Sequence, residues 1–233
     1  MIYIGIDDTD NLESRGTGRL ARGIAATLSE RYHLLGVTRH QLLVDPRVPY
    51  TSHNSSAAIR LSEDGDVDLA ALADAVGEMM LADFQAGSDP GLCVARVIPA
   101  EVSDFGRRAK VELVFQSEAH ALAARAGCIL RGLGGTRDGV IGALAATGLA
   151  ATGNDGRFLL AGTSRDLQGM QKVSAIVAHG IAEVRSMHGG QLSGDAVVQT
   201  NGKLRPAFRE GRPILFVQPS ADDATVWTPV KLD

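Results

Sequence analysis

The sequence lacks several features that would assign it to a specialised class of protein. Only two of its 233 residues are cysteines, Cys93 and Cys128, and no Cys/His cluster has the spacing of a zinc site. No apolar run approaches the roughly 20 residues that a membrane-spanning helix needs, and the N-terminus carries no signal-peptide pattern. We therefore expect a cytoplasmic protein with free, buried thiols and no membrane partner.

The sequence also lacks an excess of positive charge. Its formal net charge is −4, which gives the chain no general attraction to nucleic acid. The best basic cluster is Arg205, Arg209 and Arg212, and a solvated surface explains it as well as an RNA contact does. Apolar residues make up 45% of the chain, enough to bury the core of one large or two small domains. The composition does not indicate an oligomeric state.

Helix-like and strand-like segments alternate for most of the length, which favours an α/β or mixed α+β fold. Apolar periodicity predicts helices at 17–30, 66–84 and 139–149, the second beginning near Asp66 or Asp68. Residues 101–126 are expected to be mostly helical, with VELVF (111–115) open between helix and strand. Strands are expected at 2–6, 34–44, 57–61, 92–98, 158–161, 212–219 and 224–232. The Asn-Gly pair at 201–202 predicts a β-hairpin between the runs that flank it.

Three carboxylates follow directly on the first strand, IYIGI. Asp7, Asp8 and Asp10 stand where open α/β sheets bind their ligands. Close carboxylates repel one another, and a cation between them removes that repulsion. Mg²⁺ is typically bound by one or two carboxylates together with substrate phosphates, so these residues are candidates for phosphoryl chemistry. The alternative is an Asx-type turn surrounded by surface acids.

Two glycine-rich segments lead into predicted helices and are candidate phosphate sites. In GLGGTRDG (132–139) the backbone N–H groups at a helix N-terminus favour an anion, and Arg137 adds a charged donor. This segment is neither a Walker A loop nor a clean GxGxxG, and a helix entry that needs tight packing is the alternative. In SRGTG (14–18), Thr17 is placed to cap the next helix and to touch a ligand.

The loop DPRVPYTSHNSS (45–56) is long and polar. Such loops are seldom structural necessities, so His53 and Asn54 are candidate substrate contacts. A solvated loop histidine is the alternative for His53.

Taken in order, these stretches resemble the archaeal tRNA(Ile) 2-agmatinylcytidine synthetases. The segments that match are GIDDTD (5–10), TGRLA (17–21), Pro49-Tyr50 through Asn54, GVIGALAA (139–146) and RPILFVQ (212–218). The resemblance implies an ATP-dependent, kinase-like core at residues 1–61 and 128–233. It also implies a ferredoxin-like sub-domain inserted at residues 62–127.

The resemblance further implies ATP and Mg²⁺ as cofactors. Asp7, Asp8 and Asp10 would be the catalytic carboxylates, with Asp8 and Asp10 holding the metal. Contacts to the nucleotide would come from Thr9, Thr17, Gly18, Gly135, Arg137, Gly139 and Gly142. His53 and Asn54 would contact the substrate.

Three functions follow from this interpretation. The main prediction is an ATP- and Mg²⁺-dependent, kinase-like or ligase-like transferase that phosphorylates or activates an unidentified small molecule. The first alternative is a tRNA-modifying enzyme with a separate RNA-binding partner. The net charge and the absence of the family's OB-fold and zinc ribbon before Asp233 disfavour it. The second alternative is a nucleotide-binding module without turnover. It follows from Gly18, which stands where the family has a phosphorylated threonine, and from YTSHNSS (50–56), which lacks the family's cations.

Overall fold

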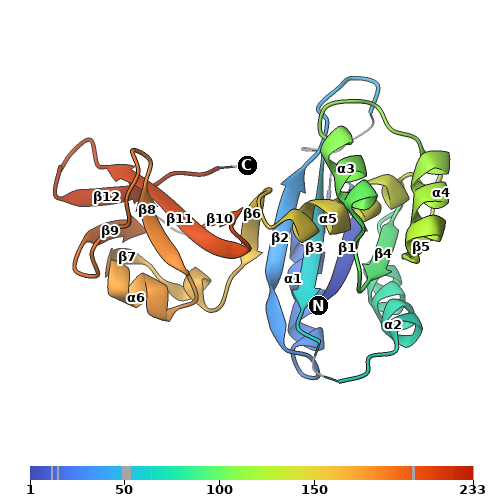
Figure 1. Ribbon diagram of the computed structural model, residues 1–233, viewed down its shortest axis with the longest axis horizontal. Coiled ribbons are helices and arrows are strands. Elements are labelled where there is room, and N and C mark those ends of the chain that lie inside the picture. The colour runs from blue at the N-terminus through green and yellow to red at the C-terminus, as the bar shows by residue number, and fades with distance from the viewer. Residues whose placement is uncertain (12, 15, 49–53, 64, 201–202, 233) are drawn as a thin grey trace. The chain divides into compact units, whose positions relative to one another are not determined.

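The structure is a computed structural model that describes residues 1–11, 13–14, 16–48, 54–63, 65–200 and 203–232. Contacts divide the chain into two units, Met1–Thr152 and Gly153–Asp233 (Figure 1). Each unit combines helices with mostly antiparallel strands, which confirms the expected α+β class. The boundaries predicted for a ferredoxin-like sub-domain, 61/62 and 127/128, both fall inside the first unit.

The first unit is built on an antiparallel sheet whose described strands are ordered β5-β4-β1-β3-β2. The central strand is covered on both faces: Ile2, Ile4 and Ile6, which share one face, are fully buried, and Gly5 on the other face lies against Ala143. The strands are β1 (Ile2–Asp7), β2 (Leu34–Gln41), β3 (Ser55–Leu61), β4 (Gly91–Ala95) and β5 (Ile129–Gly132).

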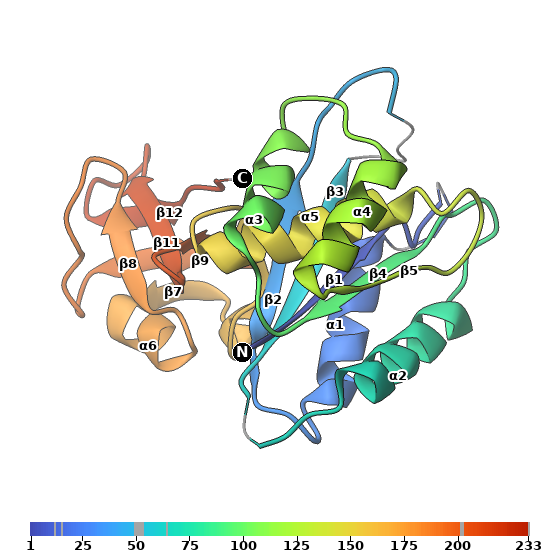
Figure 2. The same cartoon turned by 45° about the vertical axis from the view of Figure 1, so that its right-hand side comes forward.

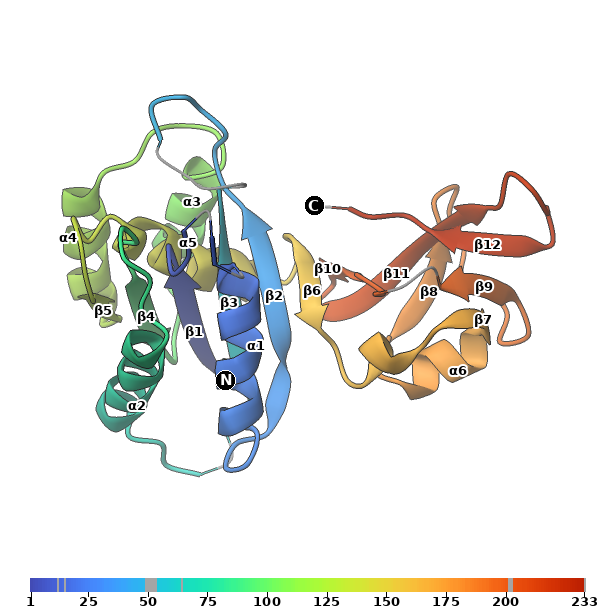
Figure 3. The same cartoon turned by 180° about the vertical axis from the view of Figure 1, so that it is seen from behind.

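Helices cover both faces of this sheet. α1 and α2 pack on one face, and α5 lies across the other, where α3 and α4 pack against it (Figures 2 and 3). The carboxylate of Asp68 caps α2 by accepting hydrogen bonds from the amides of Ala70 (2.9 Å) and Ala71 (3.1 Å). The helices are α1 (Thr17–Leu28), α2 (Leu69–Ala82), α3 (Ala100–Arg108), α4 (Gln116–Ala126) and α5 (Gly139–Thr152). Residues 111–115, left open by the sequence, belong to no helix or strand.

Helix α5 lies unusually close to β1. A Cβ atom at Gly5 would stand 2.0 Å from the carbonyl oxygen of Ala143. One at Gly142 would stand 1.7 Å from Oδ2 of Asp7. The helix is apolar on all sides because it is enclosed between the sheet and other helices. The glycines of the GVIGALAA segment therefore serve tight packing.

The second unit is a small, mostly β structure. Its strands are ordered β6-β10-β11-β12-β9-β7, and β8 pairs in parallel with β11. Phe158 and Phe208 meet edge to face in its core, with ring centroids 5.2 Å apart. The elements are β6 (Arg157–Leu160), a 3₁₀ turn (Ser164–Asp166), β7 (Gly169–Lys172), α6 (Val173–Ala178), β8 (Glu183–Ser186), β9 (Val197–Thr200), β10 (Ala207–Arg209), β11 (Arg212–Pro219) and β12 (Val226–Pro229).

The predicted hairpin around Asn-Gly is wrong in its pairing. Residues 201–202 lie outside the described residues, and β9 pairs with β7 and β12 rather than with β10. The hairpin of this region joins β10 to β11 through Glu210 and Gly211, with φ of 55° and 74°. Positive φ at both central residues is the type I′ geometry that suits the twist of paired strands. The Asn-Gly signal therefore stands one loop before the hairpin that the described residues form.

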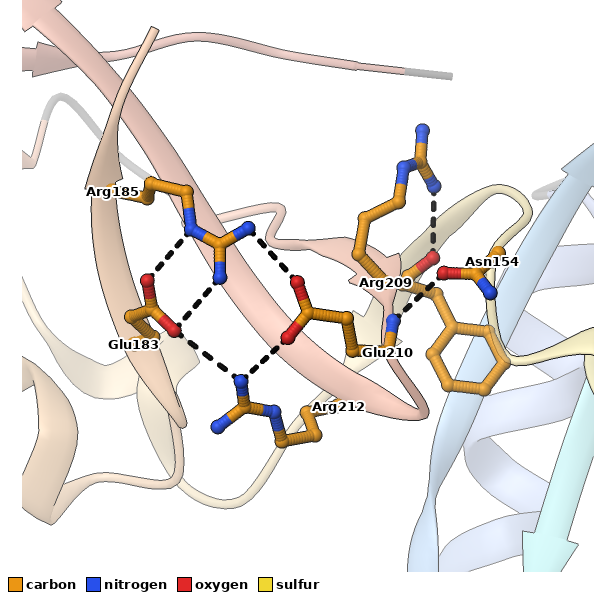
Figure 4. A network of polar contacts seen from close by, with 7 residues as sticks. Asn154, Glu183, Arg185, Arg209, Glu210 and Arg212 are labelled. Atoms are coloured by element: carbon orange, nitrogen blue, oxygen red, sulfur yellow. Dashed lines mark hydrogen bonds and ion pairs between the residues drawn. The ribbon is translucent and has the colours of Figure 1, made fainter. Parts of the chain in front are cut away.

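Two arginines and two glutamates fasten this hairpin to β8 (Figure 4). Arg185 donates to both carboxylate oxygens of Glu183 (2.7 and 3.0 Å) and to Glu210 (3.0 Å). Arg212 donates to Glu210 (2.7 Å) and to Glu183 (3.3 Å). Arg209 donates to the carbonyl oxygens of Gly156 and Phe208. Two arginines of the predicted basic cluster are thus committed to contacts within the chain.

Two glycine-to-alanine changes, one at the contact between α5 and β1 and one away from it, should have opposite effects on the free energy of unfolding. Gly5→Ala pushes a methyl group into the backbone of α5, so we expect it to lower the free energy of unfolding by about 1–3 kcal/mol or more. Gly23→Ala, in the exposed middle of α1 with no atom near its Cβ position, should raise it by about 0.5–1 kcal/mol. Urea unfolding followed by circular dichroism measures both. Equal effects would contradict the packing argument.

The ion-pair network predicts acid sensitivity of the second unit. Hydrogen bonds from Arg185 lower the pKa of Glu183, and those from Arg185 and Arg212 lower the pKa of Glu210. A carboxyl whose pKa is lower in the folded state stabilises the fold above its unfolded pKa of about 4.3. That stability is lost as the pH falls through the folded pKa, so it should decline below about pH 4.3.

Trp227, the chain's one tryptophan, lies in β12 and reports unfolding of this unit by fluorescence. Arg185→Met should weaken the acid dependence seen between pH 5 and 3. An unchanged slope in that variant would show that other carboxyls cause it. Arg31→Met, in the turn after α1 of the first unit, is the matched control.

Candidate active site

Strand β1 delivers the acidic residues to the floor of a cavity. The strand ends at Asp7, and the chain turns at Asp8, whose φ of 49° lies in the left-handed region that aspartate tolerates better than most residues. Asp7, Asp8 and Asp10 all line one cavity of about 310 Å³. The structure therefore brings together the three carboxylates that the sequence singled out.

Thr17, the first residue of α1, holds the turn that carries Asp10. Its hydroxyl donates to Oδ1 of Asp10 at 3.1 Å and accepts from the hydroxyl of Thr9 at 3.1 Å. Thr9 is buried behind Thr17 and does not line the cavity. The two threonines thus position a carboxylate, and of the two only Thr17 faces the cavity.

The pKa values at this floor are raised. Burial raises the pKa of Asp7 to about 8, and the negative charges of Asp8 and Asp10 add to the effect. Burial also raises the pKa of Asp8 to about 6, with further contributions from the charges of Asp89, Asp10 and Asp138. A nearby like charge disfavours the ionised form of a carboxyl, as burial does. Such sites are frequently functional.

Positive charge is scarce around the cavity. Arg47 is the only lysine or arginine among the described residues that line it, and its guanidinium is paired with the carboxylate of Asp45 at 2.7 and 2.8 Å. Asn54 also lines the cavity, where its side-chain amide donates to the carbonyl oxygen of Leu43 at 2.7 Å. Most of the remaining lining is apolar. Its apolar part is formed by Leu42, Leu43, Val48, Ala109, Leu113, Val114, Phe115 and Ile141.

The glycine-rich loop before α5 is bound by a carboxylate of the chain itself. Asp89 accepts from the amide (2.7 Å) and hydroxyl (2.6 Å) of Thr136, and its carbonyl oxygen accepts from the amide of Gly139 at 3.1 Å. A Cβ at Gly135 would overlap the Asp89 carboxylate. The stem of Arg137 lies against Gly132. The loop amides of Thr136 and Gly139 are therefore already occupied.

The predicted contacts divide into two groups. Those that line the cavity with the three carboxylates are Thr17, Asn54, Gly139 and Gly142. Those that do not line it are Thr9, Gly18, Gly135 and Arg137. His53 lies outside the described residues. The prediction missed Asp138, Gln116, Phe115 and Arg47, which line the cavity, and Asp89, which lies beside Asp8.

A signal for one of these residues was present in the sequence. Asp138 directly precedes the first glycine of α5, so the packing of that glycine against β4 carries Asp138 toward Asp8. Gln116 begins α4, and Phe115 ends the segment that the sequence left open between helix and strand; nothing local marks either as a cavity residue.

The described residues contain no group of three or more histidine, cysteine or acidic side chains arranged to hold a metal ion. None of the helices in this part of the chain has the length and apolar character to cross a membrane. A metal here would thus take two carboxylates at most from the described protein, which is the number that Mg²⁺ commonly takes when phosphates complete its shell.

No family model and no curated protein matches the chain. Solved structures do match in fold. A tRNA fluorescent labeling enzyme and the TiaS–tRNA(Ile2)–ATP complex each give a TM-score of 0.55 at 24% identity, over 63% of this chain and 35% or 36% of the other. A TiaS complex with tRNA(Ile2), AMPCPP and agmatine gives 0.53 at 21% identity, over 63% and 35%.

TiaS is a tRNA(Ile2) agmatidine synthetase, so these structures confirm the resemblance to that family at the level of the fold. The chain spans about a third of the length of the structures that it matches.

The threonine contacts predict a specific loss of stability. Thr17→Val keeps the shape of the side chain but removes the hydroxyl that serves both Asp10 and the buried Thr9. The change removes one hydrogen bond from Asp10 and leaves the buried Thr9 hydroxyl without its partner among the described residues, which should lower the free energy of unfolding by about 1–3 kcal/mol. Thr17→Ser keeps the hydroxyl and should cost clearly less. Urea unfolding compares the two, and an equal loss would show that the methyl group, not the hydroxyl, matters.

Proposed function

We propose that the first unit binds ATP with Mg²⁺ and uses it to activate a nucleoside of a tRNA. The observation that carries this proposal is the convergence of Asp7, Asp8 and Asp10 on one cavity, in a fold shared with structures that contain ATP and tRNA. These comparisons do not confirm the small-molecule acceptor favoured by the sequence, and they support the tRNA-modifying alternative better.

The donor set at the cavity floor fits a hard divalent cation. Its ligands are carboxylate oxygens whose negative charges raise the pKa of Asp8, and Arg47, the one cationic side chain of the described lining, is paired with Asp45. Asp8 and Asp10 would hold Mg²⁺, with Thr17 fixing the orientation of Asp10. The ion would neutralise the phosphate charge of the nucleotide.

The residues of the chain act mainly by positioning. Asp7, set against Gly142 at the floor, would orient the attacking group of the acceptor. In phosphoryl transfer most of the rate acceleration comes from such positioning and from charge stabilisation. The second unit, or a partner protein, would supply the contacts to the rest of the RNA.

The test is nucleotide binding and turnover by Asp8→Asn. Asparagine tolerates the left-handed backbone of this position but lacks the charge that a cation needs. We expect MgATP to bind at least about tenfold more weakly, which corresponds to about 1.4 kcal/mol. Titration calorimetry measures it, and formation of AMP or ADP with and without bulk tRNA is assayed alongside.

Asp222→Asn, at an exposed carboxylate of the second unit, is the matched control and should bind as the wild type does. Product formed only with tRNA supports the RNA acceptor, and product formed equally without it points to another acceptor. Binding without any product favours a nucleotide-binding module. Wild-type protein that does not bind MgATP would refute the proposal.

A further inference from the structure

The cavity that holds the carboxylates has a second half of different chemistry. Phe115, the residue before α4, lines it while about two thirds of its surface (66%) is exposed. Leu113 and Val114, which also line the cavity, precede it in a segment that belongs to no helix or strand. Ile141 of α5 and Leu42 after β2 complete the apolar wall. An exposed aromatic ring at the edge of a ligand-sized cavity is a surface on which a flat ring can stack.

The same segment offers unused backbone groups. Within the described part of the chain, the amide and carbonyl groups of Leu113 and Val114 have no hydrogen-bond partner. Both residues are only half-buried and lie at the cavity wall. The backbone of this segment therefore presents both donors and acceptors. An adenine ring carries an acceptor nitrogen next to its amino group and can use both.

A chain of contacts joins this wall to the acidic floor. The side-chain amide of Gln116, next to Phe115, donates to Oδ1 of Asp138 at 3.0 Å and to the carbonyl oxygen of Thr136 at 3.0 Å. The charge of Asp138 in turn contributes to the raised pKa of Asp8. Phe115 is therefore the sequence neighbour of Gln116, whose side chain contacts Asp138.

Glu112 is the charged residue of the described lining that stands next to this segment in the sequence. It pairs with Arg108, which also pairs with Glu118, so its charge is partly offset. The other carboxylates of the described lining are Asp7, Asp8, Asp10 and Asp138.

We propose that Leu113, Val114 and Phe115 form the base-binding half of the nucleotide site, with Phe115 stacking on the adenine of ATP. The inference rests on the proposed function and assigns to it residues that the resemblance did not indicate. The phosphates lie toward Asp8 and Asp10, and the base lies against the wall.

The experiment separates the base from the phosphates. MgATP and magnesium tripolyphosphate, which has no base, are titrated into the wild type and into Phe115→Ala. Loss of one stacked base should weaken MgATP binding roughly 5- to 150-fold. Binding of magnesium tripolyphosphate should change less than about twofold, because the acidic floor is intact. Phe115→Trp keeps an aromatic face and should restore most of the MgATP affinity.

Val111→Ala is the matched control, because Val111 is even more exposed (76%) and lies in the same loop but does not line the cavity. It should bind both ligands as the wild type does. Circular dichroism of each variant verifies the fold. A Phe115→Ala variant that binds MgATP normally, or loses both ligands equally, overturns the base site alone. Wild-type protein that binds neither ligand overturns the proposed function together with it.

Discussion

The close approach of α5 to β1 is the constraint on which the rest of the first unit depends. With only a hydrogen at Gly5, the carbonyl of Ala143 can lie almost on the strand. The N-terminal turn of α5 then reaches Asp7 through Gly142. The same packing brings Asp138 within electrostatic range of Asp8. A larger residue at the crossing would lift the helix and open the floor of the cavity.

The carboxylate cluster works against the stability of this arrangement. Burial and mutual repulsion raise the pKa of Asp7 and Asp8, so each carboxylate is less easily charged than a free one. The fold offsets part of this cost locally, since the hydroxyl of Thr17 donates to Asp10. A chain that needed only a turn after β1 would gain from neutral residues here. Carboxylates that are held together at a cost in stability are frequently found at functional sites.

The sequence predicted those parts of the fold that have a strong local signal. β1 is a continuous apolar run, α1 has a clear period, and α2 has a capping aspartate, so each was placed within a few residues. The hairpin was misplaced because Asn-Gly is the stronger signal, whereas pairing is decided by which strands share a core. The Glu210–Gly211 turn is the one that the sheet uses.

The sequence predicted the first three carboxylates of the candidate site but not the residues that more distant segments bring to it. Asp7, Asp8 and Asp10 are adjacent in the sequence and stand at a strand end, so their convergence followed from local geometry. Asp89 and Phe115 are distant from them in the sequence, and only the packing of α5 between β4 and α4 brings their segments to the cavity. Arg137 was expected at the phosphates because of its charge, but its stem packs on Gly132. Long-range packing, which no local pattern reports, decided each of these cases.

The acidic lining and the apolar lining of the cavity favour different parts of a ligand, and together they favour one kind of ligand. The floor attracts cations and repels free anions, because Arg47 is the only cationic side chain of the described lining and Asp45 already holds it. A polyphosphate can lie there only with its charge neutralised by metal. The lining around Phe115 is mostly apolar and favours a flat, uncharged ring. A free metal ion suits only the acidic lining and a free base only the apolar lining. A metal-bound nucleotide suits both, and this selectivity arises from the separation of charge and apolar surface within one cavity.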